Sequence, residues 1–100
     1  MAVLELTLVP IGTKETSVSK YVATAYKAIE NMDDINVDLN PMGTVLEGDI
    51  DKLFLAVRKM QEAVFSEGAN RVYSVIKIDD RRDEDHSMSY KVESVKKKLK

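Results

Sequence analysis

Two short turns of the same composition carry most of the residues that could bind a ligand. The sequence "PIGT" (Pro10 to Thr13) returns as "PMGT" (Pro41 to Thr44), and these turns contain the only two prolines of the chain. Each turn offers a glycine, which allows close approach, and a threonine hydroxyl. Ser17 and Ser19 follow the first turn, where a helix N-terminus would leave backbone N–H groups free, and Glu47 follows the second. These residue types favour a binding site over a catalytic one.

The composition excludes several other kinds of site. The chain has no cysteine, which rules out disulfides, zinc–thiolate centres, iron–sulfur clusters and a thiol nucleophile. Its only histidine, His86, lies in a polar stretch with no paired nucleophile, so we expect a surface residue and no enzyme. We also expect no cofactor and no metal site. A net charge of −2 argues against nucleic-acid binding, which normally needs a basic face.

The length of 100 residues suits a single domain, because a second core could not be closed from so few residues. Hydrophobic residues are 44% and charged residues 32%, which is typical of a folded soluble protein. The N-terminus lacks the basic region of a signal peptide, and no apolar run reaches the roughly 20 residues of a membrane span. We therefore expect a cytoplasmic protein without a membrane partner.

The pattern of apolar residues predicts an α+β fold. Alternation predicts strands at residues 2–9, 35–39, 44–47 and 71–78, and the polar outer side of the second places it at a sheet edge. Helical spacing predicts one helix from Val18 to Met32, capped by Thr16 or Ser17, and another from Asp49 or Asp51 to Gly68. This order predicts a ferredoxin-like βαββαβ sandwich, a four-stranded antiparallel sheet with two helices on one face.

A C-terminal helix at residues 86–99 is expected to follow this core of residues 1–80. Its apolar residues form a narrow seam, and the sheet face away from the two helices carries a further apolar patch. The seam consists of Met88, Val92, Val95 and Leu99, and the patch of Val3, Val9, Tyr73 and Val75. Glu5 and Lys77 could pair across that face. Either the last helix folds over the patch or another subunit covers it; we favour a homo-oligomer, a dimer or tetramer.

Between the fourth strand and that helix lies the charged segment "IDDRRDED", from Ile78 to Asp85. It could bind a divalent ion, but we favour a structural role in which Arg81 and Arg82 tie subunits together. In the predicted topology the first strand ends at the edge where the second strand turns into the third. The two Pro-x-Gly-Thr turns should therefore lie near one another and form a pocket, unless they are ordinary tight turns.

Four segments, "LELTLVPIGT", "SVSKYV", "NPMGTVLEGD" and "IKIDDRRD", resemble the thiamine-binding-protein-like family over nearly the whole chain. The resemblance implies a ferredoxin-like fold, assembly through the sheets, and binding of thiamine or its hydroxymethylpyrimidine part. It also implies five ligand-binding residues: Thr13, Ser17, Ser19, Thr44 and Glu47. An aminopyrimidine presents a donor–acceptor edge that a carboxylate and a hydroxyl can match. Lys14, however, would be unfavourable beside a cationic ligand.

One alternative stays open at this point, a non-catalytic regulatory or assembly module of the same topology. Such a module would bind another metabolite, an anion or a protein, and side chains would fill the space around Thr13 and Thr44. The sequence leaves open the sheet face on which Glu47 lies, because the register of the third strand is not fixed by its pattern.

Overall fold

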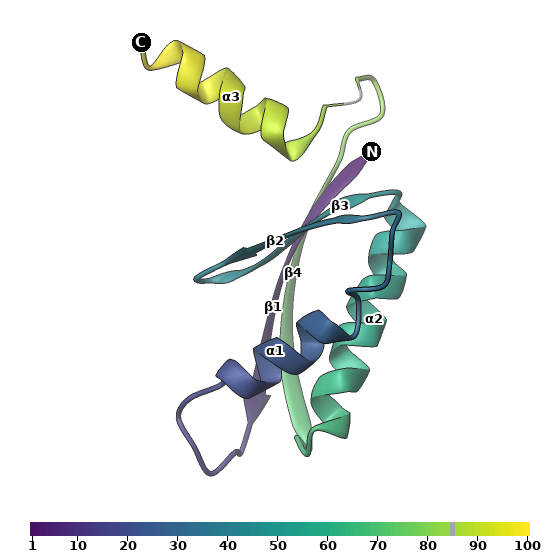
Figure 1. The fold of residues 1–100 in the computed structure, drawn as a ribbon, viewed down its shortest axis with the longest axis vertical. Helices are drawn as coiled ribbons and strands as arrows, with labels where there is room; N and C mark the ends of the chain where they lie inside the picture. The colour runs from purple at the N-terminus through teal and green to yellow at the C-terminus, as the bar shows by residue number, and fades with distance from the viewer. Residues whose placement is uncertain (85) are drawn as a thin grey trace.

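The computed structural model describes residues 1–84 and 86–100. Strands and helices follow one another in the ferredoxin-like order, with one further helix at the C-terminus (Figure 1). The predicted fold class is confirmed. The elements are β1 (Ala2–Ile11), α1 (Ser19–Lys27), β2 (Asn36–Asn40), β3 (Gly43–Gly48), α2 (Ile50–Ser66), β4 (Arg71–Asp80) and α3 (Met88–Lys98).

The four strands form one antiparallel sheet in the order β2-β3-β1-β4, so β2 lies at an edge as predicted. Helices α1 and α2 lie together on one face of this sheet (Figure 1). Leu4 and Leu6 of β1 point to that face and are almost fully buried, whereas Glu5 points to the other face and is paired with Lys77 of β4. The strict alternation of apolar residues in β1 therefore divides the helix-covered face from the open face.

The core lies between the sheet and α2. Asp49 caps this helix by accepting a hydrogen bond from the backbone N–H of Asp51, as the sequence predicts. Gly68 follows the helix with a φ of +119°, a conformation that glycine adopts without strain. The predicted apolar stripe is buried against the sheet, and its members are Leu53, Val57, Met60 and Val64.

Helix α1 is shorter than predicted at both ends. It starts at Ser19 after an uncapped Val18, because the Ser17 hydroxyl lies 3.3 Å from that of Ser19 and does not bond a helix N–H. The helix ends at Lys27, and the chain continues to Met32 through tight turns in which the N–H groups of Ile29, Glu30 and Met32 bond the carbonyl three residues back. The prediction of a Thr16 or Ser17 cap was therefore wrong. The helix buries Tyr21 and Ala25, and Ile29 in the following turn is also buried.

Strand β1 is longer than predicted. Pro10 does not end it, because from Thr7 onward β1 pairs only with β4 and has no strand on its other side. A proline, which lacks an N–H, is tolerated where a strand has one neighbour. The strand consequently continues to Ile11 and extends past the end of β3.

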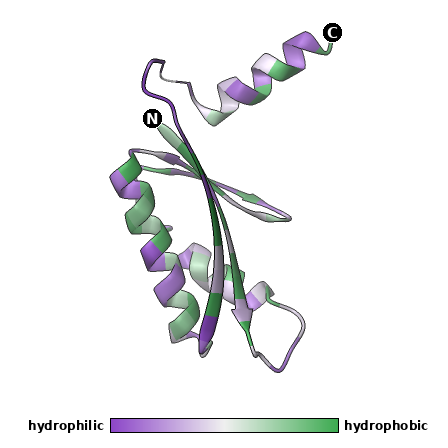
Figure 2. Ribbon diagram, turned by 180° about the vertical axis from the view of Figure 1, so that it is seen from behind, coloured by the Kyte–Doolittle hydropathy of each residue, from purple (hydrophilic) through white to green (hydrophobic). Residues whose placement is uncertain are grey.

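Helix α3 projects from the body of the protein (Figures 1 and 2). It contains no buried residue, and Val95 and Leu99 of its apolar seam are 58% and 79% exposed. The radius of gyration is 14.8 Å, larger than the roughly 13 Å of a compact 100-residue domain, because of this projection. The helix does not fold across the patch on its own sheet, where Tyr73 remains 60% exposed. No helix in the described residues is both long and apolar enough to cross a membrane.

Candidate ligand-binding site

The two Pro-x-Gly-Thr turns do not meet. The second turn lies beside the middle of β1, where the Thr7 hydroxyl donates a hydrogen bond of 3.0 Å to the Met42 carbonyl. The chain of the first turn leaves the sheet only after Ile11, four residues farther along β1 than Thr7, which at about 3.3 Å per residue corresponds to about 13 Å. The prediction that the turns are adjacent was wrong because β1 extends past β3.

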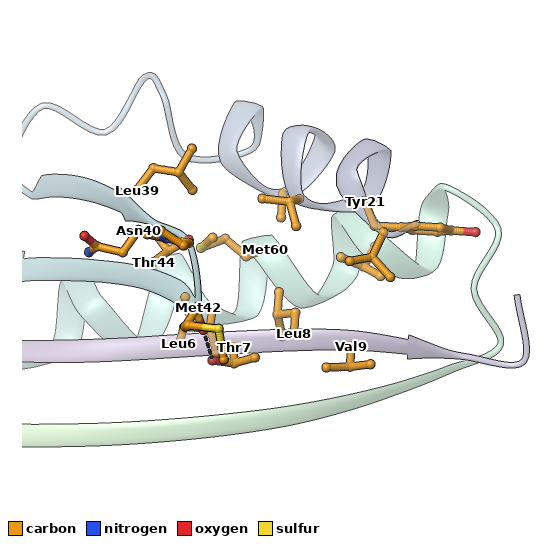
Figure 3. A pocket seen from close by; sticks show the side chains of 16 residues that line it. Leu6, Thr7, Leu8, Val9, Tyr21, Leu39, Asn40, Met42, Thr44 and Met60 are labelled. Atoms are coloured by element: carbon orange, nitrogen blue, oxygen red, sulfur yellow. Dashed lines mark hydrogen bonds between the residues drawn. The ribbon is translucent and has the colours of Figure 1, made fainter. Parts of the chain in front are cut away.

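A cavity of about 180 Å³ occupies the space between the second turn and α1 (Figure 3). Its walls are the extended half of β1, the inner side of α1, the β2–β3 turn and two side chains of α2. Most of them are apolar, which suits an aromatic or aliphatic group. The residues that line it include Leu8, Val9, Tyr21, Met42 and Thr44.

Thr44 is the notable polar residue in this wall. It is opposite Leu6 in the β1–β3 ladder and so lies on the helix-covered face, where it is 6% exposed. Its hydroxyl forms no hydrogen bond with any residue that the structure describes. A hydroxyl can donate one hydrogen bond and accept two, so Thr44 offers unused hydrogen-bonding capacity to a molecule in the cavity.

The backbone of β1 is the second polar element of the cavity. Both Leu8 and Val9 line it although their side chains point to opposite faces of the sheet, because the free edge of the strand borders the space. A strand edge without a neighbour presents N–H and C=O groups in alternation. The cavity therefore combines apolar walls with a short row of backbone donors and acceptors.

Gly43 allows the second turn to lie this close to β1. A Cβ atom at this position would lie 3.0 Å from the Thr7 Oγ1 atom and 3.1 Å from the Leu6 carbonyl oxygen. Both distances are shorter than ordinary contacts of a carbon atom. The glycine is thus required by close approach, and the position of Thr44 depends on it.

The other predicted site residues lie outside this cavity. Thr13 lines a separate, more polar cavity at the first turn, and its hydroxyl donates a hydrogen bond of 2.9 Å to the Glu15 carbonyl. Ser17 and Ser19 are exposed at the start of α1 and border neither cavity. Tyr21 borders both cavities and forms the wall between them.

Glu47 lies on the opposite face of the sheet. It is opposite Val3 in the ladder and only 4% exposed, so the structure answers the question of its orientation. One carboxylate oxygen accepts a hydrogen bond of 2.7 Å from the Asn36 side chain, and the other accepts one from the Met88 N–H at the start of α3. A carboxylate at a helix N-terminus is favourable, and here it fixes where α3 begins.

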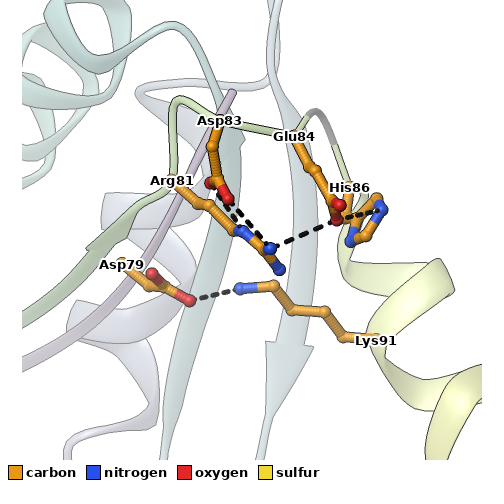
Figure 4. A network of polar contacts seen from close by, with 6 residues as sticks. All are labelled: Asp79, Arg81, Asp83, Glu84, His86 and Lys91. Carbon is orange, nitrogen blue, oxygen red and sulfur yellow. Dashed lines mark hydrogen bonds and ion pairs between the residues drawn. The ribbon is translucent and has the colours of Figure 1, made fainter.

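The charged segment between β4 and α3 pairs largely with itself (Figure 4). Arg81 binds Asp83 through two hydrogen bonds of 2.7 and 3.1 Å, and Arg82 binds Asp80 at 2.8 Å. The hydrogen bond from Arg81 lowers the pKa of the Asp83 carboxyl group. The described residues contain no acidic or histidine cluster suited to a metal ion, and Asp85 lies outside them.

Comparison with known proteins identifies the family. The sequence matches the thiamine-binding protein family over residues 4–96. The chain belongs to this family. Among its relatives, a UPF0045 protein of Methanothermobacter thermautotrophicus is 47% identical over 100 residues, covering 99% of this chain and all of the relative.

Solved structures share the fold of this chain. The crystal structure of the hypothetical protein MJ1052 of Methanocaldococcus jannaschii matches with a TM-score of 0.85 and 36% identity, over 95% of both chains. TM0486 of Thermotoga maritima, named for a suggested place in thiamine biosynthesis or salvage, matches with a TM-score of 0.76 over 94% of this chain and 97% of its own. Its 16% identity supports the fold alone.

Sequence reasoning missed Tyr21 and the free edge of β1 as parts of the site. Tyr21 was hidden because its ring belongs to the buried side of α1 and resembles an ordinary core residue. The free edge of β1 could not be predicted because it depends on the offset between β1 and β3. One signal was available: Thr44 and Glu47 are an odd number of residues apart in one strand, which places them on opposite faces.

Proposed function

We propose that this member of the thiamine-binding protein family binds, without catalysis, the hydroxymethylpyrimidine part of thiamine in the cavity beside Thr44. The observation that carries the proposal is the Thr44 hydroxyl, which has no hydrogen-bond partner among the described residues and lies in the wall of an apolar cavity of about 180 Å³. A ligand that bonds this hydroxyl gains a hydrogen bond that contributes about 1 kcal/mol.

The chemistry of an aminopyrimidine fits these walls. Its ring is flat and can pack between Leu8 and the side chains of α1, while its edge carries a donor next to an acceptor. The free edge of β1 presents the complementary alternation, and Thr44 supplies a further donor. The open cavity also favours this function over a regulatory module in which side chains would fill the space.

Calorimetry with hydroxymethylpyrimidine tests the proposal. We expect Thr44→Val, which keeps the shape and removes the hydroxyl, to weaken binding about tenfold, or about 1.4 kcal/mol. Thr16→Val, at an exposed position that borders neither cavity, should leave the affinity unchanged. The proposal fails if neither hydroxymethylpyrimidine nor thiamine produces heat with the wild-type protein at high concentration.

Glu47 remains a predicted ligand residue, and its position makes a separate test necessary. Because it lies on the other face from Thr44, a ligand in the cavity cannot reach both side chains of one chain. We expect Glu47→Gln to change the affinity for hydroxymethylpyrimidine less than twofold. A tenfold loss in this variant, with α3 still in place, would return Glu47 to the binding site.

We propose further that the protein is a homo-oligomer assembled through its open sheet face and α3. Tyr73 and Val75 are 60% and 38% exposed on that face, and every residue of the α3 seam after Met88 is more than half exposed. Val95→Glu should reduce the molar mass measured by light scattering to that of one chain. Leu55→Glu, on an exposed position of α2, is the matched control. A wild-type protein that remains a monomer at high concentration contradicts this assembly.

A further inference from the structure

A second cavity, of about 320 Å³, lies at the first Pro-x-Gly-Thr turn next to the cavity of Thr44. It is formed by the loop after β1, the first turn of α1 and the residues between α2 and β4. Tyr21, which is 8% exposed, is the only residue that borders both cavities among those described. A ligand that leaves the first cavity along the free edge of β1 therefore passes Tyr21 and enters the second.

The charged residues of the second cavity are Lys14, Lys20 and Glu15, which leaves one positive charge in excess. Neither lysine forms an ion pair with a carboxylate of the described chain, although Lys52 and Lys77 elsewhere do. The ammonium group of Lys20 instead lies 5.2 Å from the centre of the Tyr21 ring. Lysines without a carboxylate partner beside a cavity are suited to bind an anion.

The sizes of the two cavities limit the ligand. Pockets for drug-sized ligands begin at roughly 300 Å³, so the cavity of about 180 Å³ accepts a single ring and no second one. A substituent on the ring that extends along the free edge of β1 past Tyr21 reaches the second cavity. The thiazolium ring of thiamine is a cation and would meet the like charges of Lys14 and Lys20 there, whereas an anionic substituent would be attracted.

We infer that the preferred ligand is a phosphate monoester of a single-ring hydroxymethyl heterocycle, with the ring beside Thr44 and the phosphate between Lys14 and Lys20. This inference rests on the proposed function, because it extends the ligand of the Thr44 cavity. Tyr21 separates the apolar part of the site from its polar part, and Lys20 is held near the boundary by the aromatic ring. Thr13 adds a side chain that can bond a phosphate oxygen if its hydroxyl turns away from the Glu15 carbonyl.

Calorimetry with three probes tests this inference: hydroxymethylpyrimidine, its phosphate monoester and thiamine. The monoester should bind at least tenfold more tightly than the alcohol, and thiamine more weakly than either. In Lys14→Gln/Lys20→Gln the advantage of the monoester should disappear while the affinity for the alcohol stays the same. Lys27→Gln/Lys59→Gln removes the same charge from exposed positions outside both cavities and should preserve the advantage.

Two further results separate this inference from the proposed function. Inorganic phosphate should compete with the monoester and leave the affinity for the alcohol unchanged. If the alcohol and the monoester bind equally, or if both double variants lose the same affinity, the phosphate site is refuted and the proposed function stands. If no pyrimidine binds the wild-type protein, both are refuted.

Discussion

The two Pro-x-Gly-Thr turns share a sequence pattern and have different structural roles. In the first turn, Gly12 has a φ of +83° and open space around it, and Thr13 bonds its own loop. In the second, Gly43 has ordinary strand geometry and lies against β1, and Thr44 is buried beside a cavity with its hydroxyl unused. The first glycine is needed for backbone conformation and the second for close approach, so one pattern of residues serves two different physical requirements.

The difference comes from where each turn lies relative to the sheet. The second turn joins two paired strands and is held against a third by the Thr7 hydroxyl. The first leaves the sheet at the end of β1, where only β4 continues beside the chain. A residue that follows a turn can therefore line a site only when neighbouring elements enclose it.

Among the substitutions that compare the two turns, Gly43→Val is expected to lower the free energy of unfolding most. The new side chain would collide with the Leu6 carbonyl and Thr7, and overpacking of this kind costs about 3 kcal/mol. Chemical denaturation should show the free energy of unfolding lowered by this amount. A variant as stable as the wild type would mean that β3 can move away from β1, and the cavity would then not have fixed walls.

Gly12→Ala should have a smaller effect of another origin. No atom lies within 4 Å of the added Cβ, so the cost of about 1 kcal/mol arises only from the positive φ. The same denaturation experiment measures it. A loss as large as that in Gly43→Val would contradict the distinction between conformation and close approach.

Thr13→Val should be nearly neutral for stability. Its hydroxyl makes one hydrogen bond within an exposed loop, which contributes about 0.5 kcal/mol. Thermal unfolding of Thr13→Val and Thr44→Val side by side would measure the contrast. The second variant removes a hydroxyl that has no hydrogen-bond partner among the described residues, so it should not be less stable than the wild type. A marked destabilisation by Thr44→Val would reveal that its hydroxyl is already bonded.

The smallest expected effect is a change in the pKa of Asp79 on the open face, where Lys91 of α3 pairs with this residue of β4. The hydrogen bond and charge of Lys91 lower the pKa of Asp79 from its usual 3.8. Because the folded-state pKa is the lower one, the pair is complete above pH 3.8 and is lost as the pH falls through the lowered value. An NMR titration of the Asp79 carboxyl carbon should give a midpoint below 3.8 that rises in Lys91→Gln. Equal midpoints would show that α3 is not held there.

The fold could be predicted from the sequence because alternation and helical spacing each specify one kind of element. Leu4 and Leu6 identify the buried face of β1, and the stripe from Leu53 to Val64 identifies that of α2. The site could be predicted only in part. The offset of β1 against β3 depends on contacts such as that of Thr7 with Met42, and an offset by an even number of residues leaves every side chain on the same face.

The extended half of β1 has a consequence for the motions of the protein. Residues 7–11 are hydrogen-bonded to one strand, whereas residues 2–6 are flanked by two. Local opening at residues 7–11 therefore requires fewer bonds to break and has a lower free-energy cost. A molecule that occupies the cavity would bond the same backbone and raise that cost. The exchange rate of these amide protons should therefore depend on whether the cavity is occupied. Hydrogen exchange along this part of β1 would then detect ligand binding.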